Sequence, residues 1–441
     1  MSEYLQSVGL DVGTTSTQMV VSRLTVENRA SAFAVPDLDI TERTILYKSP
    51  VHFTPLLDES HVDGAAIRAI VEAEYRKAGI RREDVDTGAI IITGETSRKE
   101  NARAVLEALA DFAGDFVVTT AGPDLESVLA AKGAGAVEYS RSTGKTVLHM
   151  DIGGGTSNLA LIQDGKILQT GCLNVGGRLV KLEKTGKITY ISKVLSGIFH
   201  QKLGETATQD QLTALAETLT QALEMAAGLR EATPLLEKLL TEETRAVWRP
   251  PDAPVVLSFS GGVADCIAEE RSWLAYGDLG PILGRVIRKS RLCRGEYVLG
   301  KETIRATVIG AGSYSTQLSG STVFCQNIHF PLKNLPVTAP DSGLHEGSVV
   351  LSIPGIPSPS YTEVRELARE LADRNPGELY ICLEADMAKA LGQALAARLP
   401  PNTPILCIDR VRVGEDSFLD IGAPVGSALP VVVKTLVLEK S

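Results

Sequence analysis

The sequence lacks several features that would place it in a common class of protein. No two of its six cysteines form a C-x-x-C pair, so a zinc site, a redox motif and a disulfide framework are all disfavoured. No apolar run reaches about 18 residues, and the segment from Met1 to Tyr4 has neither the basic nor the apolar region of a signal peptide. We therefore expect a cytoplasmic protein with reduced thiols and no membrane-spanning segment.

An excess of basic residues is also missing. The chain has 44 Lys and Arg against 54 Asp and Glu, a net charge of −10 at pH 7. Binding to duplex nucleic acid requires a basic face, so we expect no nucleic-acid partner. The one dense basic cluster contains Arg285, Arg288, Lys289, Arg291 and Arg294. Such a cluster is most often a solvated face, and the alternative is a docking surface for an acidic partner.

The chain is long enough to form several hydrophobic cores. It has 441 residues, of which 44% are apolar and 22% charged, as in a globular protein. Because single cores stop growing beyond a few hundred residues, roughly three units of about 150 residues are the first expectation.

The most informative stretch runs from His149 to Asn158. An apolar strand ends in Asp151 and is followed by three glycines and two hydroxyl residues. Successive glycines let backbone N–H groups turn toward one anion where a Cβ would clash, and the strand-end carboxylate is placed to hold Mg²⁺. The candidate phosphate-binding residues are Gly153, Gly154, Gly155 and Thr156. Taken alone, an ordinary hairpin turn explains this stretch equally well.

Repetition favours the phosphate-binding interpretation. The segment from Gly9 to Thr17 has the same order of apolar residue, Asp, apolar residue, Gly and hydroxyl residues, with Asp11 placed 140 positions before Asp151. Its candidate phosphate-binding residues are Gly13, Thr14 and Thr15. Two facing hairpins, each donating a carboxylate to one metal ion, would clamp a nucleotide.

A third motif lies between Val255 and Asp265, where a strand again leads into a Gly-Gly turn and the start of a helix. Here Gly261, Gly262 and Val263 would let a flat base and a ribose lie against the backbone. In this order and spacing, the three motifs resemble those of the ATPase superfamily of actin, heat-shock chaperones and sugar kinases.

The resemblance implies an α/β fold of two actin-like, ribonuclease H-like lobes around a cleft that binds ATP or ADP with Mg²⁺. It implies metal-binding and catalytic roles for Asp11 and Asp151. We expect the first lobe to span residues 1–142, with 306–334 returning to it, and the second to span 143–305. A C-terminal α/β unit is expected over 335–441, because the composition changes near Leu335 and prolines from Pro331 to Pro359 mark a boundary there.

Two helices rich in small residues are expected to connect the lobes. The segment from Pro123 to Gly133 has proline at its first position and glycine at its end, and a second small-residue helix starts near Thr307. Such helices can cross at close range and form a pivot. The chaperones usually carry a Glu immediately before this proline, where Gly122 stands here. Glu126 is then the nearest acid that could reach the metal-bound water, and it is our third catalytic candidate.

The remaining pattern predicts further elements. Expected helices cover 61–79, 97–112, 210–229, 282–291, 361–374 and 385–398, and expected strands cover 18–24, 45–53, 88–93, 116–120, 158–162, 166–170, 378–383, 404–409 and 431–438. Glu95, after a buried strand, is either a site acid or a helix cap. Packing is the commoner use for His52 and His61.

The segments between the motifs resemble the ethanolamine ammonia-lyase reactivating ATPases, which implies a chaperone-like role on that lyase. The reactivase would release damaged cobalamin so that intact adenosylcobalamin can bind, and would use slow ATP hydrolysis with Mg²⁺ to reset itself. Entry into a bacterial microcompartment stays open. The alternatives are a nucleotide-dependent actin-like scaffold and a small-molecule kinase, although no further acidic motif supplies the base that a kinase needs.

Overall fold

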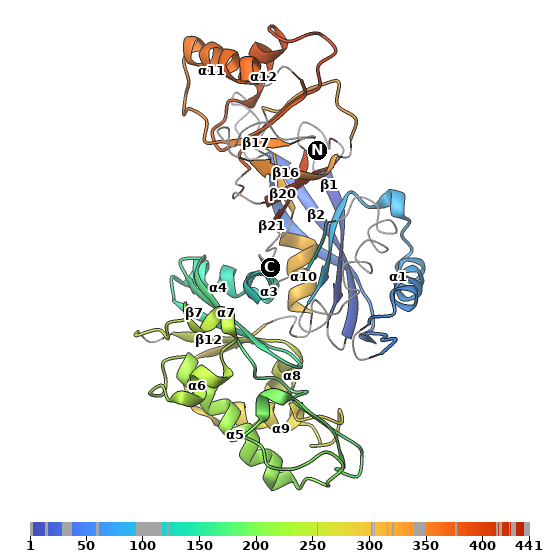
Figure 1. Cartoon of the computed structure of the whole chain (residues 1–441), viewed down its shortest axis with the longest axis vertical. Coiled ribbons are helices and arrows are strands. Elements are labelled where there is room, and N and C mark those ends of the chain that lie inside the picture. The colour runs from blue at the N-terminus through green and yellow to red at the C-terminus, as the bar shows by residue number, and fades with distance from the viewer. Residues whose placement is uncertain are drawn as a thin grey trace.

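The computed structural model is elongated and has three units along its length (Figure 1). It describes residues 3–13, 16–28, 38–58, 61–93, 117–120, 123–253, 255–300, 303, 305–314, 316–319, 322–330, 332–338, 349–374, 377–411, 413, 417–422, 424 and 429–435. Thr14, Thr15, Glu95, Gly122, the expected helix at 97–112 and the last residues of the expected strand at 431–438 lie outside the described part of the chain.

The first lobe contains a sheet in the order β3-β2-β1-β5-β6, with the short β4 paired to β2. Its strands are β1 (Glu3–Val12), β2 (Ser16–Asn28), β3 (Leu38–Lys48), β4 (His52–Phe53), β5 (Thr87–Ile92) and β6 (Val117–Thr120). Alternate residues of β1, such as Val8 and Leu10, pack against Ile67 and Val71 of α1 (Gly64–Ala78) on one face. On the other face Ile91 of β5 packs among residues of α3 (Pro123–Gly133) and α10 (Ala306–Tyr314).

The second lobe repeats this plan in the order β13-β12-β7-β8-β9. Its strands are β7 (Val147–Ile152), β8 (Ser157–Gln163), β9 (Lys166–Leu173), β12 (Val256–Ser260) and β13 (Tyr297–Leu299). In both lobes the first strand pairs antiparallel with the second and parallel with the strand on its other side. The shared order and directions agree with the expected fold of two similar lobes.

The repeat extends to single residues of the two motif hairpins. Asp11 is paired with Gln18 across β1 and β2, as Asp151 is with Asn158 across β7 and β8. Each hairpin turn is closed by a hydrogen bond of 2.9 Å, from Gly13 N to the Ser16 carbonyl and from Gly153 N to the Thr156 carbonyl. The sequence repeat therefore corresponds to a structural one.

Helices α3 and α10 cross between the lobes (Figure 1). A Cβ added to Gly133 of α3 would overlap the carbonyl oxygen of Ala306, and one added to Gly310 of α10 would overlap that of Leu129. Only residues without a side chain allow this approach, so the predicted close crossing of the two helices is confirmed. Ala131 of α3 packs against the second lobe's sheet, and the helix thus contacts both lobes.

The C-terminal unit is an eight-stranded sheet in the order β14-β21-β20-β16-β17-β18-β19-β15. Its strands are β14 (Thr316–Leu318), β15 (Phe324–Gln326), β16 (Leu332–Thr338), β17 (Val350–Ile353), β18 (Leu379–Leu383), β19 (Ile405–Asp409), β20 (Ser417–Ile421) and β21 (Pro430–Thr435). The expected division at residue 335 lies inside β16, and β14 and β15 pair with strands of this sheet. Helices α11 (Tyr361–Arg374) and α12 (Ala388–Ala396) pack on the apolar face formed by β17, β18 and β19.

The other described elements complete the second lobe and the connections. They are α4 (Ala136–Thr143), α5 (Gln209–Ala226), α6 (Pro234–Leu239), α7 (Glu242–Arg245), α8 (Gly262–Ala268), α9 (Gly280–Lys289), β10 (Val180–Leu182), β11 (Ile188–Ile191) and the 3₁₀ turns η1 (Arg82–Asp84), η3 (Lys193–Leu195) and η4 (Arg291–Cys293). The predicted helices at 123–133 and 361–374 match α3 and α11. The strand predicted at 45–53 is confirmed at 45–48 in β3 and at 52–53 in β4, but its continuity is wrong, because Pro50 interrupts the pairing between them.

The surface features agree in part with the sequence. All six cysteines are free, although Cys325 is exposed. Among the described helices, none combines the length and the apolar character needed to cross a membrane. Within the basic cluster, Arg291 donates to the Leu229 carbonyl and Arg285 lies 3.6 Å from Glu270. The side chains of Arg288 and Lys289 are exposed, and the docking alternative stays a prediction.

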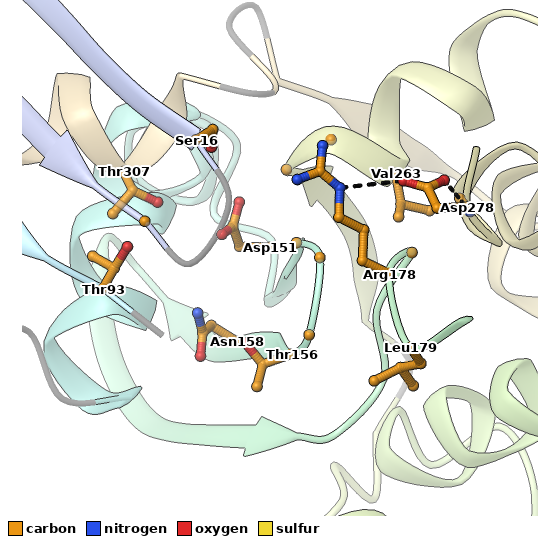
Figure 2. Close-up of a pocket in the computed structure, with 18 of the residues that line it drawn as sticks. Ser16, Thr93, Asp151, Thr156, Asn158, Arg178, Leu179, Val263, Asp278 and Thr307 are labelled. Atoms are coloured by element: carbon orange, nitrogen blue, oxygen red, sulfur yellow. Dashed lines mark hydrogen bonds and ion pairs between the residues drawn. The ribbon is translucent and has the colours of Figure 1, made fainter. Parts of the chain in front are cut away.

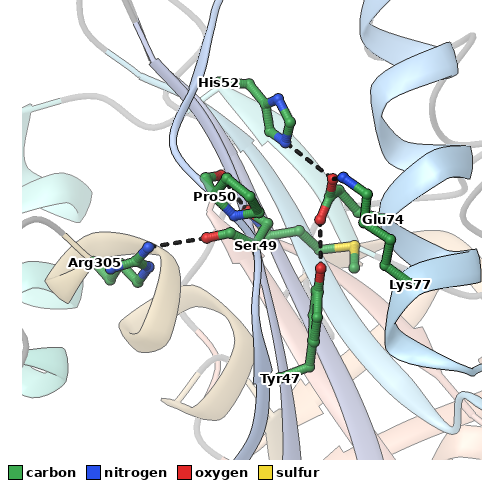
Figure 3. Close-up of polar contacts among 8 residues, drawn as sticks. Tyr47, Ser49, Pro50, His52, Glu74, Lys77 and Arg305 are labelled. Atoms are coloured by element: carbon green, nitrogen blue, oxygen red, sulfur yellow. Dashed lines mark hydrogen bonds and ion pairs between the residues drawn. The ribbon is translucent and has the colours of Figure 1, made fainter.

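A buried carboxylate ties α1 to the edge of the first lobe's sheet (Figure 3). Glu74 has a side chain only 1% exposed and accepts hydrogen bonds from Tyr47 Oη at 2.6 Å and Lys77 Nζ at 2.7 Å. His52 Nε2 lies 3.0 Å from the same carboxylate. Burial acts to raise the pKa of Glu74, but the hydrogen bonds from Lys77, Tyr47 and His52 and the charge of Lys77 together hold it below its ordinary value.

We expect Glu74→Gln to lower the free energy of unfolding by about 2 kcal/mol at neutral pH, because hydrogen bonds to a buried charge are lost. A lowered pKa stabilises the fold above the unfolded-state pKa, and this stabilisation disappears as pH falls through the folded value. The difference between variant and wild type should therefore shrink under acidic conditions. Urea unfolding at neutral and acidic pH measures it, with Glu72→Gln as control, since Glu72 is a half-exposed residue of the same helix. An equal loss at both pH values would contradict the assignment.

Candidate functional site

A cavity of about 530 Å³ is lined by residues of both lobes (Figure 2). Each residue predicted from the three motifs that the structure describes lies on its wall, as does Glu126 of the connecting helix. These residues are Asp11, Gly13, Glu126, Asp151, Gly153, Gly154, Gly155, Thr156, Gly261, Gly262 and Val263. Segments separated by more than 200 positions in the sequence are thus brought to one site.

Two carboxylates face this cavity from opposite lobes. Thr93 Oγ1 donates to Asp11 Oδ1 at 2.8 Å. Burial raises the pKa of Asp11 to about 7, the bond from Thr93 opposes the rise, and the negative charge of Asp151 adds to it. Burial likewise raises the pKa of Asp151 to about 6, against hydrogen bonds from Ser260 and Thr307. Two carboxylates close enough to repel each other in a buried site are suited to share a divalent cation.

A buried histidine sets the orientation of Asp151. His149 Nδ1 lies 3.0 Å from Ser258 Oγ and its Nε2 lies 2.9 Å from Ser260 Oγ. The Ser260 hydroxyl donates its only hydrogen to Asp151 Oδ1, so Nε2 must be the donor to Ser260. Burial lowers the pKa of His149 to about 3, and the ring is therefore neutral.

No role was expected for His149, although its position in the sequence carries a signal. His149 and Asp151 are two residues apart on β7 and point to the same face of the sheet. Their partners in the parallel strand β12 are Ser258 and Ser260. Only the pairing of these two strands brings the four polar side chains together.

The glycine turn after β7 is held by a second turn from residues 175–178. Gly177 N donates to the Gly153 carbonyl at 3.0 Å, and Arg178 N donates to the Gly154 carbonyl at 2.6 Å. A Cβ on Gly155 would meet nothing within 4 Å. In the third motif, Gly261 has a φ of +85° and lies so close to the end of β7 that a Cβ there would overlap the Ile152 carbonyl. Backbone therefore forms much of the wall at both motifs.

Arg178 brings a positive charge to the cavity and was not predicted. Its Nε lies 3.3 Å from Asp278 Oδ2, a contact visible in Figure 2. Its guanidinium carbon is 5.9 Å from the ring centroid of Phe53, which belongs to the first lobe. A guanidinium in such a cavity suits an anionic oxygen cluster. The signal available in the sequence was an arginine directly after a Gly-Gly turn.

Glu126 lies on the cavity wall at α3, where its side chain is 8% exposed. Asn158 Nδ2 donates to Glu126 Oε2 at 2.8 Å, which joins the connecting helix to β8 of the second lobe. The carboxylate is thus oriented by the residue that pairs with Asp151 in the hairpin.

A model of the ethanolamine utilisation protein EutA family matches residues 3–439. The chain belongs to this family. A curated relative from Salmonella typhimurium, named ethanolamine ammonia-lyase reactivase EutA, is 38% identical, and one of the same name from Escherichia coli is 36% identical. Each alignment covers 98% of this chain and 98% of the relative.

Solved structures similar to this EutA-family chain are more distant. An Aquifex aeolicus PPX-GPPA enzyme aligns with a TM-score of 0.44 at 12% identity, covering 70% of this chain and 99% of that one. The ethanolamine utilization protein EutJ from Carboxydothermus hydrogenoformans aligns with a TM-score of 0.34 at 17% identity, covering 70% and 89%.

The cavity of this EutA-family chain has the chemistry that a magnesium-bound nucleotide requires. Its volume lies within the range of about 300–1,000 Å³ typical of small-molecule sites. Carboxylate oxygens at Asp11 and Asp151 are the ligands that Mg²⁺ prefers, and glycine turns leave the backbone open to phosphate. The residues present therefore fit the cofactor expected from the sequence.

We expect Arg178→Gln to weaken ATP binding about tenfold, which corresponds to about 1.4 kcal/mol. The substitution removes the positive charge while leaving a side chain of similar reach. Isothermal titration with ATP and Mg²⁺ measures the change. Lys181→Gln is the matched control, because Lys181 is an exposed residue three positions further along the chain that stacks on Tyr190. Equal weakening by both substitutions would mean that ATP binding depends on the net positive charge of the lobe and not on the position of Arg178.

Proposed function

We propose that this protein is an ethanolamine ammonia-lyase reactivase that binds ATP with Mg²⁺ between its lobes and hydrolyses it slowly. Two curated relatives that bear this name, each aligned over nearly the whole chain, support the client and the activity. Nucleotide binding is supported by one observation: the two motif hairpins bring Asp11 and Asp151 to the same cavity. Family membership favours this function over an actin-like scaffold or a small-molecule kinase.

The residue roles are part of the proposal. Asp11 and Asp151 would hold the metal ion, and a bound Mg²⁺ supplies positive charge to the phosphate oxygens. Ser260 and His149 would keep the Asp151 carboxylate in position, and Glu126 would orient water near it. The proposed phosphate-binding residues are Gly13, Thr14, Thr15, Gly153, Gly154, Gly155, Thr156 and Arg178. Gly261, Gly262 and Val263 would support the adenosine.

ATP can change how the protein binds the lyase only if the protein has two conformations that differ in their affinity for nucleotide and in their affinity for the lyase. The crossing of α3 and α10 is the proposed pivot, since Thr307 of α10 hydrogen-bonds to Asp151 of the opposite lobe. A change in lobe angle would alter the grip on the lyase, so that damaged cobalamin leaves and adenosylcobalamin enters. We place the boundary between the first lobe and the C-terminal unit near residue 315, before β14.

The direct test is recovery of cobalamin-inactivated ethanolamine ammonia-lyase. The inactive lyase is incubated with this protein, ATP, Mg²⁺ and free adenosylcobalamin, and ammonia release is followed. We expect activity to return only when all four components are present. Recovery that is equally fast without ATP would remove the nucleotide from the proposal, and no recovery at all would remove the client. Titration with ATP alone separates a failure of the cleft from a failure to recognise the lyase.

A further inference from the structure

Three oxygen-bearing side chains meet at the end of the C-terminal sheet, away from the nucleotide cavity. Asp409 is the last residue of β19, and Asp386 lies in the loop between β18 and α12. Thr322 comes two residues before β15, whose antiparallel register with β19 pairs Phe324 with Cys407. Continuing that register places Thr322 opposite Asp409. The carboxyl ends of parallel strands are where open α/β sheets usually bind ligands.

These three residues offer more hydrogen-bond acceptors than the Thr322 hydroxyl can satisfy. Thr322 Oγ1 lies 2.9 Å from Asp386 Oδ1 and is also in contact with Asp409 Oδ2. A hydroxyl has one hydrogen to donate, so it can satisfy only one of the two carboxylates. The Asp386 and Asp409 carboxyl groups are themselves within hydrogen-bond reach, so these contacts need either a shared proton or a cation between the oxygen atoms.

Asp409 adds an independent observation. Its side chain is 0% exposed, and in the part of the chain that the structure describes its Oδ1 has no hydrogen-bond partner. A buried, unpaired carboxylate oxygen is costly unless a positive charge balances it. The guanidinium of Arg410 lies 3.0 Å from Asp386 Oδ2 and is 39% exposed. It pairs with Asp386, whereas Asp409 accepts a hydrogen bond from the backbone N–H of Ala388, which carries no full charge.

We propose that Thr322, Asp386 and Asp409 form a binding site for a divalent cation with hard character, either Mg²⁺ or Ca²⁺. All donors are oxygen atoms, which excludes a preference for soft metals. Within the described residues no group of three or more His, Cys, Asp or Glu side chains forms a metal cage. Water must therefore complete the coordination shell, as is usual for Mg²⁺.

The position of the site suggests what the ion does. Thr322 lies in the connection between β14 and β15, whereas Asp386 follows the parallel strand β18 and Asp409 ends the parallel strand β19. An ion held by all three fastens the connection between β14 and β15, the two edge strands of the sheet, to its parallel strands. Binding should therefore raise the melting temperature of the full chain.

The test is isothermal titration of the nucleotide-free full chain with MgCl₂ and, separately, with CaCl₂. We expect one of the two ions to bind, and Asp409→Asn to weaken its binding by more than about tenfold, since even partners outside the first coordination shell contribute that much. Asp151→Asn, which removes a proposed metal ligand of the cleft, should retain this binding event, and that separates the two sites. Glu384→Gln is the matched control, because it removes one exposed negative charge from the same loop.

Circular dichroism establishes whether Asp409→Asn is folded. If it is not, Asp386→Asn decides, because Asp386 is only partly buried, at 38% exposure. The proposal is overturned if neither ion binds the wild type, or if the folded Asp409→Asn or Asp386→Asn variant binds as tightly as Glu384→Gln. It is also overturned if Asp151→Asn abolishes the binding, since the ion would then occupy the cleft.

Discussion

Asp151→Asn should reduce ATP hydrolysis to less than about a hundredth of the wild-type rate, a loss typical of removing one preorganised electrostatic group from an active site. The substitution keeps the shape of the side chain and lets Ser260 still donate to it. It removes the negative charge that would hold the metal ion between the two hairpins. Phosphate release at saturating ATP and Mg²⁺ measures the effect, and the same loss is expected for Asp11→Asn because the two hairpins repeat each other.

The control for this experiment is Asp252→Asn, which removes one charge from an exposed loop of the same lobe. It should hydrolyse ATP as the wild type does. Far-ultraviolet circular dichroism and urea unfolding verify that the Asp151 variant is folded. Wild-type turnover in a folded Asp151→Asn protein would contradict the proposed role and with it the clamp between the lobes.

The parts of the site that could be predicted are those encoded by local sequence. Asp11 and Asp151 each end an apolar strand and precede glycine, so their place at a turn follows from strand length and turn chemistry alone. The repeat then implied that both turns serve one ligand. The helix from Pro123 to Gly133 was equally local, because its first and last residues are the ones that helices use at those positions.

The parts that could not be predicted depend on strand pairing between distant segments. His149 acquires its role only because β12 lies beside β7 and brings Ser258 and Ser260 to it. Arg178 reaches the cavity because the turn that carries it hydrogen-bonds to the first glycine turn, and its partner Asp278 is 100 positions away. No periodicity in the sequence records such a contact.

The C-terminal unit shows the same limit. Its parallel strands and two helices alternate, which the sequence revealed as an α/β pattern. Strands β14 and β15 contain three residues each and are defined by pairing with β21 and β19. Segments this short carry no usable alternation, so the boundary was expected at residue 335, where the prolines begin to cluster, although the sheet begins at Thr316.

Gly310→Ala should destabilise the protein by about 3 kcal/mol, although alanine is the better helix former. In an ordinary helix the substitution would stabilise by about 1 kcal/mol. Here the added methyl group would overlap the carbonyl oxygen of Leu129 on α3, which is backbone and has no rotamer to change. The two helices must separate, and the cost of that overpacking exceeds the gain in helix propensity.

Urea unfolding of the full chain measures this loss, and Gly295→Ala is the matched control, since a Cβ at Gly295 would meet nothing within 4 Å. The control should unfold within about 0.5 kcal/mol of the wild type, as surface substitutions usually do. Gly133→Ala should reproduce the loss from the other helix, because its Cβ would overlap the Ala306 carbonyl. If the crossing is also the pivot between lobes, both helix variants should hydrolyse ATP more slowly under conditions where they remain folded. Wild-type stability in Gly310→Ala would show that α3 and α10 are further apart than the structure places them.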